Sequence, residues 1–161
     1  MNRLHVIQEE IQVRAKEITS RQDDWPCRKG CDECCRKLAS VPLITEEEWR
    51  LVAAALNSPA ETAELARRRI RDSVNLSRPV VCPLLDISSG SCLIYDARPL
   101  ACRAYGFYVK RQNVLGCSRI ESIADESSEI VWGNHTVLEK RIHRLGPAAE
   151  LHQWLTSESD A

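Results

Sequence analysis

Four cysteines lie within nine residues, from Cys27 to Cys35, and this density constrains the chain more than any other feature. Such clusters bind metal or carry out redox chemistry in a reducing compartment, where structural disulfides are rare. Four further cysteines follow at wider intervals, so that eight thiols are available. The candidate metal ligands are Cys27, Cys31, Cys34, Cys35, Cys82, Cys92, Cys102 and Cys117.

Length and charge exclude several classes of protein. The 161 residues suffice for a hydrophobic core, and we expect a single domain over residues 1–161. A formal net charge of −1 gives no overall attraction to nucleic acid or acidic lipid. No apolar run approaches the roughly 20 residues of a membrane span, and Met1 to Ser20 carries too many polar residues for a signal peptide. We therefore expect a cytoplasmic protein without a nucleic-acid or membrane partner.

Hydrophobic periodicity and capping signals predict a mainly helical fold. The spacing of apolar residues from Leu4 to Ile18 predicts a helix over about residues 3–20. Thr45 and Glu48 form a capping box that starts a helix ending near Leu56. Further helices are expected at about 59–76, begun by Ser58 and Pro59, at 98–103 with Asp96 as a cap, within 118–130, at 135–145 and at 148–155.

The remaining segments are expected to be loops and short extended stretches. Two apolar runs, 80–85 and 91–95, flank a Ser/Gly turn and predict a small hairpin with one cysteine on each arm. Residues 107–115 are expected to be extended. Gly30 permits a tight turn in the first cysteine cluster, which then enters a short helical turn. The predicted architecture is a mainly α, single compact helical domain with a small β-hairpin and irregular metal-binding cysteine loops.

Soft thiolate ligands suit zinc, iron or an iron–sulfur cluster, and suit magnesium or calcium poorly. Gaps of two or three residues allow thiolates to converge on one centre, whereas the side chains of adjacent residues tend to diverge. The Cys34–Cys35 pair therefore favours more than one metal atom over a lone tetrahedral zinc. We expect an iron–sulfur cluster, [4Fe–4S] first, or a zinc or iron ion.

Positive charge near the later cysteines fits an anionic metal centre. Arg98 and Arg103 lie close to Cys102 in the sequence, where they would offset thiolate charge, and Tyr95 could hydrogen-bond near the site. Among the histidines, His135 is the best candidate for a non-cysteine ligand, and His5, His143 and His152 are expected to be surface residues.

The order of the cysteine motifs resembles the family of zinc- or iron-chelating domains (YkgJ-like) that is named for a CxxCxxCC cluster. The resemblance spans about residues 27–105, and its first cysteine gap is three residues where the family's name implies two. It implies metal chelation, and members are often labelled iron–sulfur oxidoreductases. The motifs are Cys27-x-x-Gly-Cys31-x-x-Cys34-Cys35-Arg36, Cys82-Pro-Leu-Leu, Gly90-Ser-Cys92-Leu-Ile-Tyr95 and Arg98-Pro99-x-x-Cys102-Arg103.

Three functions stay open at this stage. The first is an iron–sulfur protein with a redox or electron-transfer role and a redox partner. The second is a non-catalytic, zinc-stabilised module that binds proteins or delivers metal. The third, by family analogy alone, is a protein lysine methylase or its accessory. The radical S-adenosylmethionine fingerprint also fits Cys27, Cys31 and Cys34, but the chain has too few strands for that fold. Whether the chain is an enzyme is left open.

Overall fold

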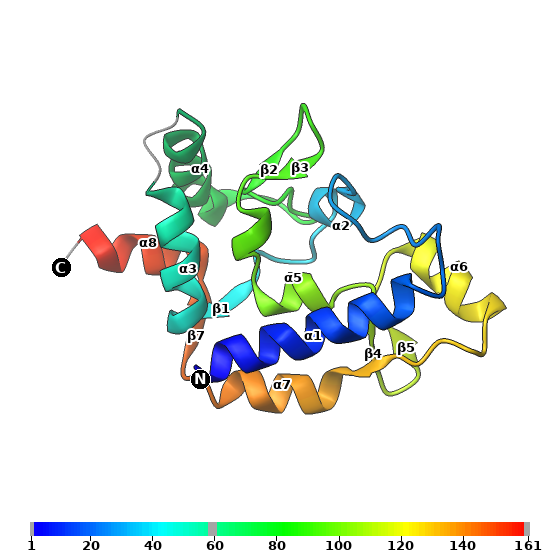
Figure 1. The fold of residues 1–161 in the computed structure, drawn as a ribbon. Helices are drawn as coiled ribbons and strands as arrows, with labels where there is room; N and C mark the ends of the chain where they lie inside the picture. The colour runs from blue at the N-terminus through cyan, green and yellow to red at the C-terminus, as the bar shows by residue number, and fades with distance from the viewer. Residues whose placement is uncertain (1, 58–60, 160–161) are drawn as a thin grey trace. The chain divides into compact units, whose positions relative to one another are not determined.

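The computed structural model describes residues 2–57 and 61–159, and helices predominate in them, as predicted (Figure 1). The chain divides into two compact units. Unit 1 comprises residues 1–28 and 100–145, and unit 2 comprises residues 29–99 and 146–161. The single domain expected from the sequence stays a prediction. Within the described ranges, no helix combines the length and the apolar character needed to cross a membrane.

Unit 1 is built around its long first helix, α1 (Arg3–Thr19), which confirms the helix predicted for 3–20. The Asn2 side chain caps it by accepting a hydrogen bond from the Leu4 amide at 2.9 Å. Its apolar residues are buried at helical spacing, and it packs against two further helices of the unit, α5 and α7 (Figure 1). The other helices of unit 1 are α5 (Leu100–Ala104), α6 (Ser118–Glu126) and α7 (His135–His143).

A small sheet completes unit 1. Strand β4 (Tyr108–Lys110) pairs antiparallel with β5 (Asn113–Val114) and parallel with β6 (Gly133–Asn134). The stretch 107–115, expected to be extended, is therefore a hairpin, because the chain reverses at Arg111, whose φ is 61°. Trp25 lies in the core of this unit, 3% exposed, where its ring stacks on Phe107 with centroids 6.0 Å apart.

Unit 2 buries a second core beneath three helices that pack together, α3 (Glu46–Leu56), α4 (Glu61–Asp72) and α8 (Leu151–Ser159). The helix predicted to end near Leu56 is confirmed. The predicted helix start at Ser58 and Pro59 lies outside the described residues. Three short helical elements complete the unit: α2 (Glu33–Arg36) and the 3-10 turns η1 (Ser73–Asn75) and η2 (Tyr95–Ala97).

Two predicted helices of the sequence begin later than expected. The helix predicted for 148–155 starts at Leu151, because Ala148–Glu150 forms strand β7 and pairs with β1 (Leu43–Thr45) in unit 2. This pairing provides hydrogen-bond partners for backbone N–H and C=O groups that would otherwise bond within a helix. Asp96 does not cap the helix predicted for 98–103, because Asp96 lies inside η2 and α5 begins at Leu100.

The predicted cysteine hairpin is present but short. Strand β2 (Leu85–Asp86) pairs antiparallel with β3 (Ser91–Cys92), and Leu85 lies opposite Cys92. Cys82 precedes β2, so only one of the two cysteines lies within a paired strand.

The capping box of α3 supports a first prediction about stability. The Thr45 hydroxyl donates to a Glu48 carboxylate oxygen at 2.8 Å and accepts from the Glu48 amide, and Thr45 is fully buried. Loss of an N-cap costs about 1–2 kcal/mol, so Thr45→Ala is expected to lower the free energy of unfolding by that amount in urea titrations. Thr62→Ala, at an exposed position within α4, should change it by less than about 0.5 kcal/mol. Equal effects of the two substitutions would contradict the capping role.

Candidate metal centre

Four cysteine thiols meet in unit 2, and we call Cys34, Cys35, Cys82 and Cys92 the thiol cluster. The Cys35 thiol shares hydrogen bonds with the thiols of Cys34 and Cys82. Cys92 lies close enough to interact electrostatically with Cys34 and Cys35. The cluster therefore joins the short helix α2 to the segment that enters the hairpin and to the hairpin itself.

The side chains of the adjacent residues Cys34 and Cys35 do not diverge, contrary to the expectation from the sequence. Cys34 and Cys35 both lie in α2, and their thiols contact each other instead of diverging. All eight cysteines of the chain are partly buried, and none forms a disulfide.

Backbone hydrogen bonds hold the two halves of the thiol cluster together. The Cys82 amide donates to the Cys35 carbonyl at 2.7 Å. Leu38 and Val80 exchange two further bonds, of 2.9 and 2.8 Å, in an isolated β-bridge. These bonds fix the segment before the hairpin against the end of α2, so the convergence of Cys35 and Cys82 is a property of the backbone.

The surroundings of the cluster favour protonated thiols in the absence of metal. The hydrogen bond with Cys35, together with burial, raises the pKa of Cys34 far above its usual range. The bond with Cys34 lowers the pKa of Cys35, but the Cys82 thiol and burial outweigh it and raise that pKa to about 12. Burial also raises the pKa of Cys92. Because a metal binds the thiolate, binding must release these protons and should strengthen as pH rises.

A cationic group stands beside the cluster. Arg98 offsets part of the effect of burial on the pKa of Cys92, which places its charge near that thiol. Its guanidinium carbon lies 3.6 Å from the centroid of the Tyr95 ring, and its Nε donates to the Tyr95 carbonyl at 2.8 Å. The Lys29 ammonium approaches the same ring at 5.4 Å. The Tyr95 ring thus makes cation–π contacts with two basic side chains of unit 2.

The other four cysteines occupy different positions. Cys31 precedes α2 in unit 2. Cys102 lies in α5 of unit 1, as does Arg103. Cys27 and Cys117 pack against the core of unit 1, and the Cys27 thiol lies directly on Gly106, where a Cβ would be 2.2 Å from its Sγ.

The donor set suits zinc and iron by its chemistry, because it consists of four cysteine sulfurs that interact with one another. Within residues 2–57 and 61–159, however, no three Cys, His, Asp or Glu side chains already converge on a common point as ligands of one ion. The thiols of the cluster hydrogen-bond to one another instead.

His135 does not belong to this cluster. It is the first residue of α7 in unit 1, and its Nδ1 is buried with no hydrogen-bond partner among the described residues. Burial lowers the pKa of His135, so the ring favours the neutral form. His135, the candidate non-cysteine ligand, thus belongs to unit 1, whereas the thiol cluster belongs to unit 2.

A family model matches residues 26–135, a span that covers more than half of the chain and all eight cysteines. The family is CxxCxxCC, described as "Putative zinc- or iron-chelating domain". The chain belongs to this family. The resemblance seen in the sequence is confirmed, and in this CxxCxxCC protein the match continues beyond residue 105 into α7. No curated protein and no solved structure gives a match. Family membership supports zinc or iron binding by the cysteines.

The sequence predicted the turn of the hairpin, but not the hydrogen bonds that Asp86 makes in it. Asp86 accepts hydrogen bonds from the Ser88 amide at 3.0 Å, the Ser88 hydroxyl at 2.7 Å and the Ser89 hydroxyl at 2.6 Å. An Asp followed by serines two and three residues later is the local signal that could have predicted these bonds. These bonds fix the turn that carries Cys92 into β3.

The turn leads to a prediction about acid stability. Hydrogen bonds from Ser89 and Ser88 lower the pKa of Asp86 from 3.8 to about 2. The contribution of the ionised Asp86 carboxylate to the free energy of unfolding should be complete above about pH 4 and should be lost as pH falls through 2. In metal-free protein, wild type should lose more unfolding free energy than Asp86→Asn between pH 5 and 2, as measured by denaturant titrations. Parallel pH profiles for the two proteins would contradict this role.

Proposed function

We propose that this CxxCxxCC protein holds iron or zinc through the thiol cluster in unit 2. One observation carries the proposal: the Cys35 thiol contacts both Cys34, its neighbour in α2, and Cys82, which comes from a distant part of the sequence. Buried thiols that serve only as packing have no need to gather in this way, whereas a soft metal ion requires several thiolates at one centre.

An iron–sulfur cluster, [4Fe–4S] first, is the form we propose, and such a group supplies one-electron transfer when it is bound. The chain's residues would hold it by the four thiolates, and the Arg98 charge would offset part of the negative charge of the centre. We propose an electron-transfer role with a redox protein as partner, in a reducing compartment such as the cytoplasm, where thiols stay available for metal.

Structural zinc is the second candidate, and a different observation favours it. The thiol cluster joins α2 to the hairpin, and both are very short elements that need support from elsewhere. A zinc ion bound by the same four thiolates would stabilise these loops, as structural zinc sites do. Nothing in the described residues favours the methylase function, and we do not propose it.

The remaining cysteines extend the proposal. We propose that Cys31 adds a ligand in unit 2, and that Cys27, Cys102 and Cys117 supply thiolates to further metal in unit 1. Arg98 and Tyr95 would act by placing charge near the first centre, and Arg103, beside Cys102 in α5, would do so in unit 1.

Metal and acid-labile sulfide, measured per chain after anaerobic purification, test the proposal. Iron with a similar amount of sulfide, and a brown colour, would support the iron–sulfur form. Zinc without sulfide, in protein never exposed to oxygen, would exclude the cluster and support the structural zinc site. Protein that retains neither zinc nor iron, and takes up neither after anaerobic loading, would contradict both forms.

A further inference from the structure

Arg36 is the last residue of α2, directly after the adjacent cysteines, and its guanidinium reaches in two directions. Its Nε donates to an Asp32 carboxylate oxygen at 2.5 Å, one turn earlier in the chain. The guanidinium Nη2 contacts the same oxygen at 2.5 Å and donates to the Ile87 carbonyl at 3.3 Å. Arg36 therefore connects the start of α2 to the turn of the β2–β3 hairpin.

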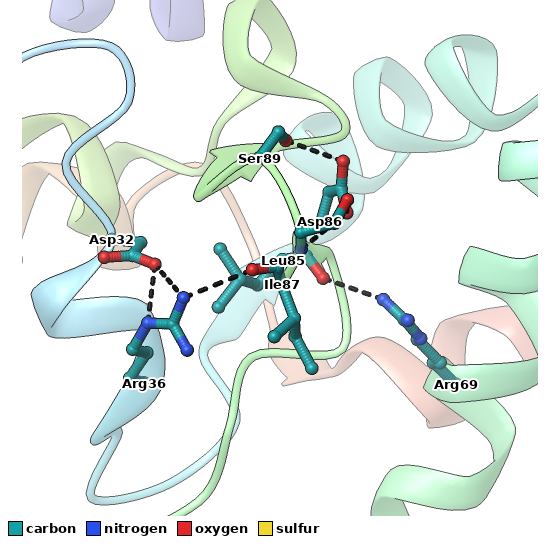
Figure 2. A network of polar contacts seen from close by, with 8 residues as sticks. Asp32, Arg36, Arg69, Leu85, Asp86, Ile87 and Ser89 are labelled. Atoms are coloured by element: carbon teal, nitrogen blue, oxygen red, sulfur yellow. Dashed lines mark hydrogen bonds and ion pairs between the residues drawn. The ribbon is translucent and has the colours of Figure 1, made fainter.

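A second arginine holds the same hairpin from α4. Arg69 donates to the Leu85 carbonyl at 2.7 Å. Figure 2 shows the two guanidinium groups approaching the 85–87 segment from opposite sides, with Asp86 and Ser89 hydrogen-bonded to each other in the turn. We call Asp32, Arg36 and Arg69 the hairpin clamp.

Direct packing adds to these bonds. A Cβ at Gly90, in the turn of the hairpin, would lie 3.2 Å from the Asp32 carboxylate and 3.5 Å from the Gly30 carbonyl. The hairpin turn thus lies against the loop that carries the first cysteines of unit 2.

The hairpin clamp and the backbone hydrogen bonds position different cysteines of the thiol cluster. Cys82 is held to Cys35 by a backbone hydrogen bond. Cys92 lies one strand further on, in β3, and among the described residues no backbone hydrogen bond joins it to α2. The position of Cys92 relative to Cys34 and Cys35 therefore depends on how the hairpin is held, and the described bonds from α2 to the hairpin turn come from Arg36.

We propose that Arg36 is a positioning residue of the metal centre, which fixes the hairpin against α2 so that Cys92 stays in place as the fourth ligand. This inference rests on the proposed function. A partner that only orients a ligand typically changes metal affinity by 10- to 100-fold when it is removed. An exposed ion pair without such a role contributes little.

The test follows zinc release from the full chain loaded anaerobically with zinc, using transfer to an excess of a coloured chelator. Arg36→Ala should release zinc about 10-fold faster than wild type. Arg36→Lys should release zinc at a rate between those of wild type and Arg36→Ala. An ammonium can bind Asp32 or the Ile87 carbonyl, but it lacks the planar guanidinium that binds both. The matched control is Arg50→Ala, which removes the i,i+4 ion pair with Glu46 on α3 in the same unit, and it should stay within about 2-fold of wild type.

Two further readouts separate positioning from general stability. Metal-free Arg36→Ala should unfold in denaturant like metal-free Arg50→Ala, and its cobalt-substituted form should show altered visible bands, because those bands report ligand geometry. Wild-type release rates in Arg36→Ala, with unchanged cobalt bands, overturn the inference and leave the proposed function intact. A metal-free Arg36→Ala that is unfolded also overturns it, since Arg36 then serves the fold. Wild-type protein that binds neither zinc nor cobalt overturns this inference and the zinc form of the proposed function, and the measurement of iron and sulfide decides the iron–sulfur form.

Discussion

Cys35→Ser is expected to abolish tight metal binding and to remove about 4 kcal/mol of the stability of the loaded protein, as for a 1,000-fold loss of affinity at saturating metal. Cys35 has this weight because its thiol contacts two other members of the thiol cluster and its carbonyl accepts from the Cys82 amide. A serine hydroxyl is a poor ligand for soft metals. The free energy of unfolding, measured in denaturant with and without zinc, gives the effect.

The metal-free proteins provide the control for Cys35→Ser. Without metal, the substitution replaces one partly buried donor by another, and the change should be below about 1 kcal/mol. With metal bound, wild type and Cys35→Ser should differ in unfolding free energy by the larger amount of about 4 kcal/mol. If Cys35→Ser destabilises both forms equally, the thiol acts through packing, and the metal centre at this position is refuted.

Gly106→Ala is the second substitution with a large expected effect, at about 2–5 kcal/mol of unfolding free energy. Two costs combine: the backbone has φ +89°, which costs an alanine about 1–2 kcal/mol, and the added Cβ would lie 2.2 Å from the Cys27 Sγ, an overpacking that costs about 1–3 kcal/mol. The Gly106 amide also donates to the Leu115 carbonyl at 2.6 Å, so the backbone has little freedom to move away.

Gly30→Ala separates the two costs. Gly30 has nearly the same φ, +92°, but no atom lies within 4 Å of its added Cβ. Its substitution should therefore cost only the backbone term, about 1–2 kcal/mol. Adding Cys27→Ala to Gly106→Ala should recover part of the loss, because the sulfur is removed from the contact. Equal losses for the two glycine variants, without recovery in the double variant, would contradict the close packing of Cys27 on Gly106.

Local signals in the sequence predicted the elements that depend on neighbouring residues. The Thr45–Glu48 capping box predicted the start of α3, and the apolar spacing from Leu4 to Ile18 predicted α1; both helices are present. The Ser/Gly turn between the cysteine arms likewise gave the hairpin. The cysteine spacing and the motif order were sufficient for the family, which the match over residues 26–135 confirms.

Features that depend on distant residues were missed. Ala148–Glu150 has helical neighbours, and only its pairing with Leu43–Thr45 makes it a strand. The divergence expected for Cys34 and Cys35 was wrong for the thiols themselves, which interact with each other and, through Cys35, with the distant Cys82. The bond from Arg36 to the Ile87 carbonyl has no local signature either. Such contacts follow from tertiary structure, which no pattern in a single sequence displays.

X-ray absorption spectroscopy at the metal edge tests the central claim most directly, on wild-type protein loaded under anaerobic conditions. The thiol cluster predicts a shell of sulfur ligands at about 2.3 Å from zinc or iron. In a variant that lacks Cys34, Cys35, Cys82 and Cys92, it predicts fewer metal–sulfur bonds per protein chain, obtained from the sulfur coordination number and the metal content together. A shell of oxygen or nitrogen ligands at about 2.0–2.2 Å without sulfur, or an unchanged number of metal–sulfur bonds per chain in the variant, would contradict the assignment of the metal to these four thiols.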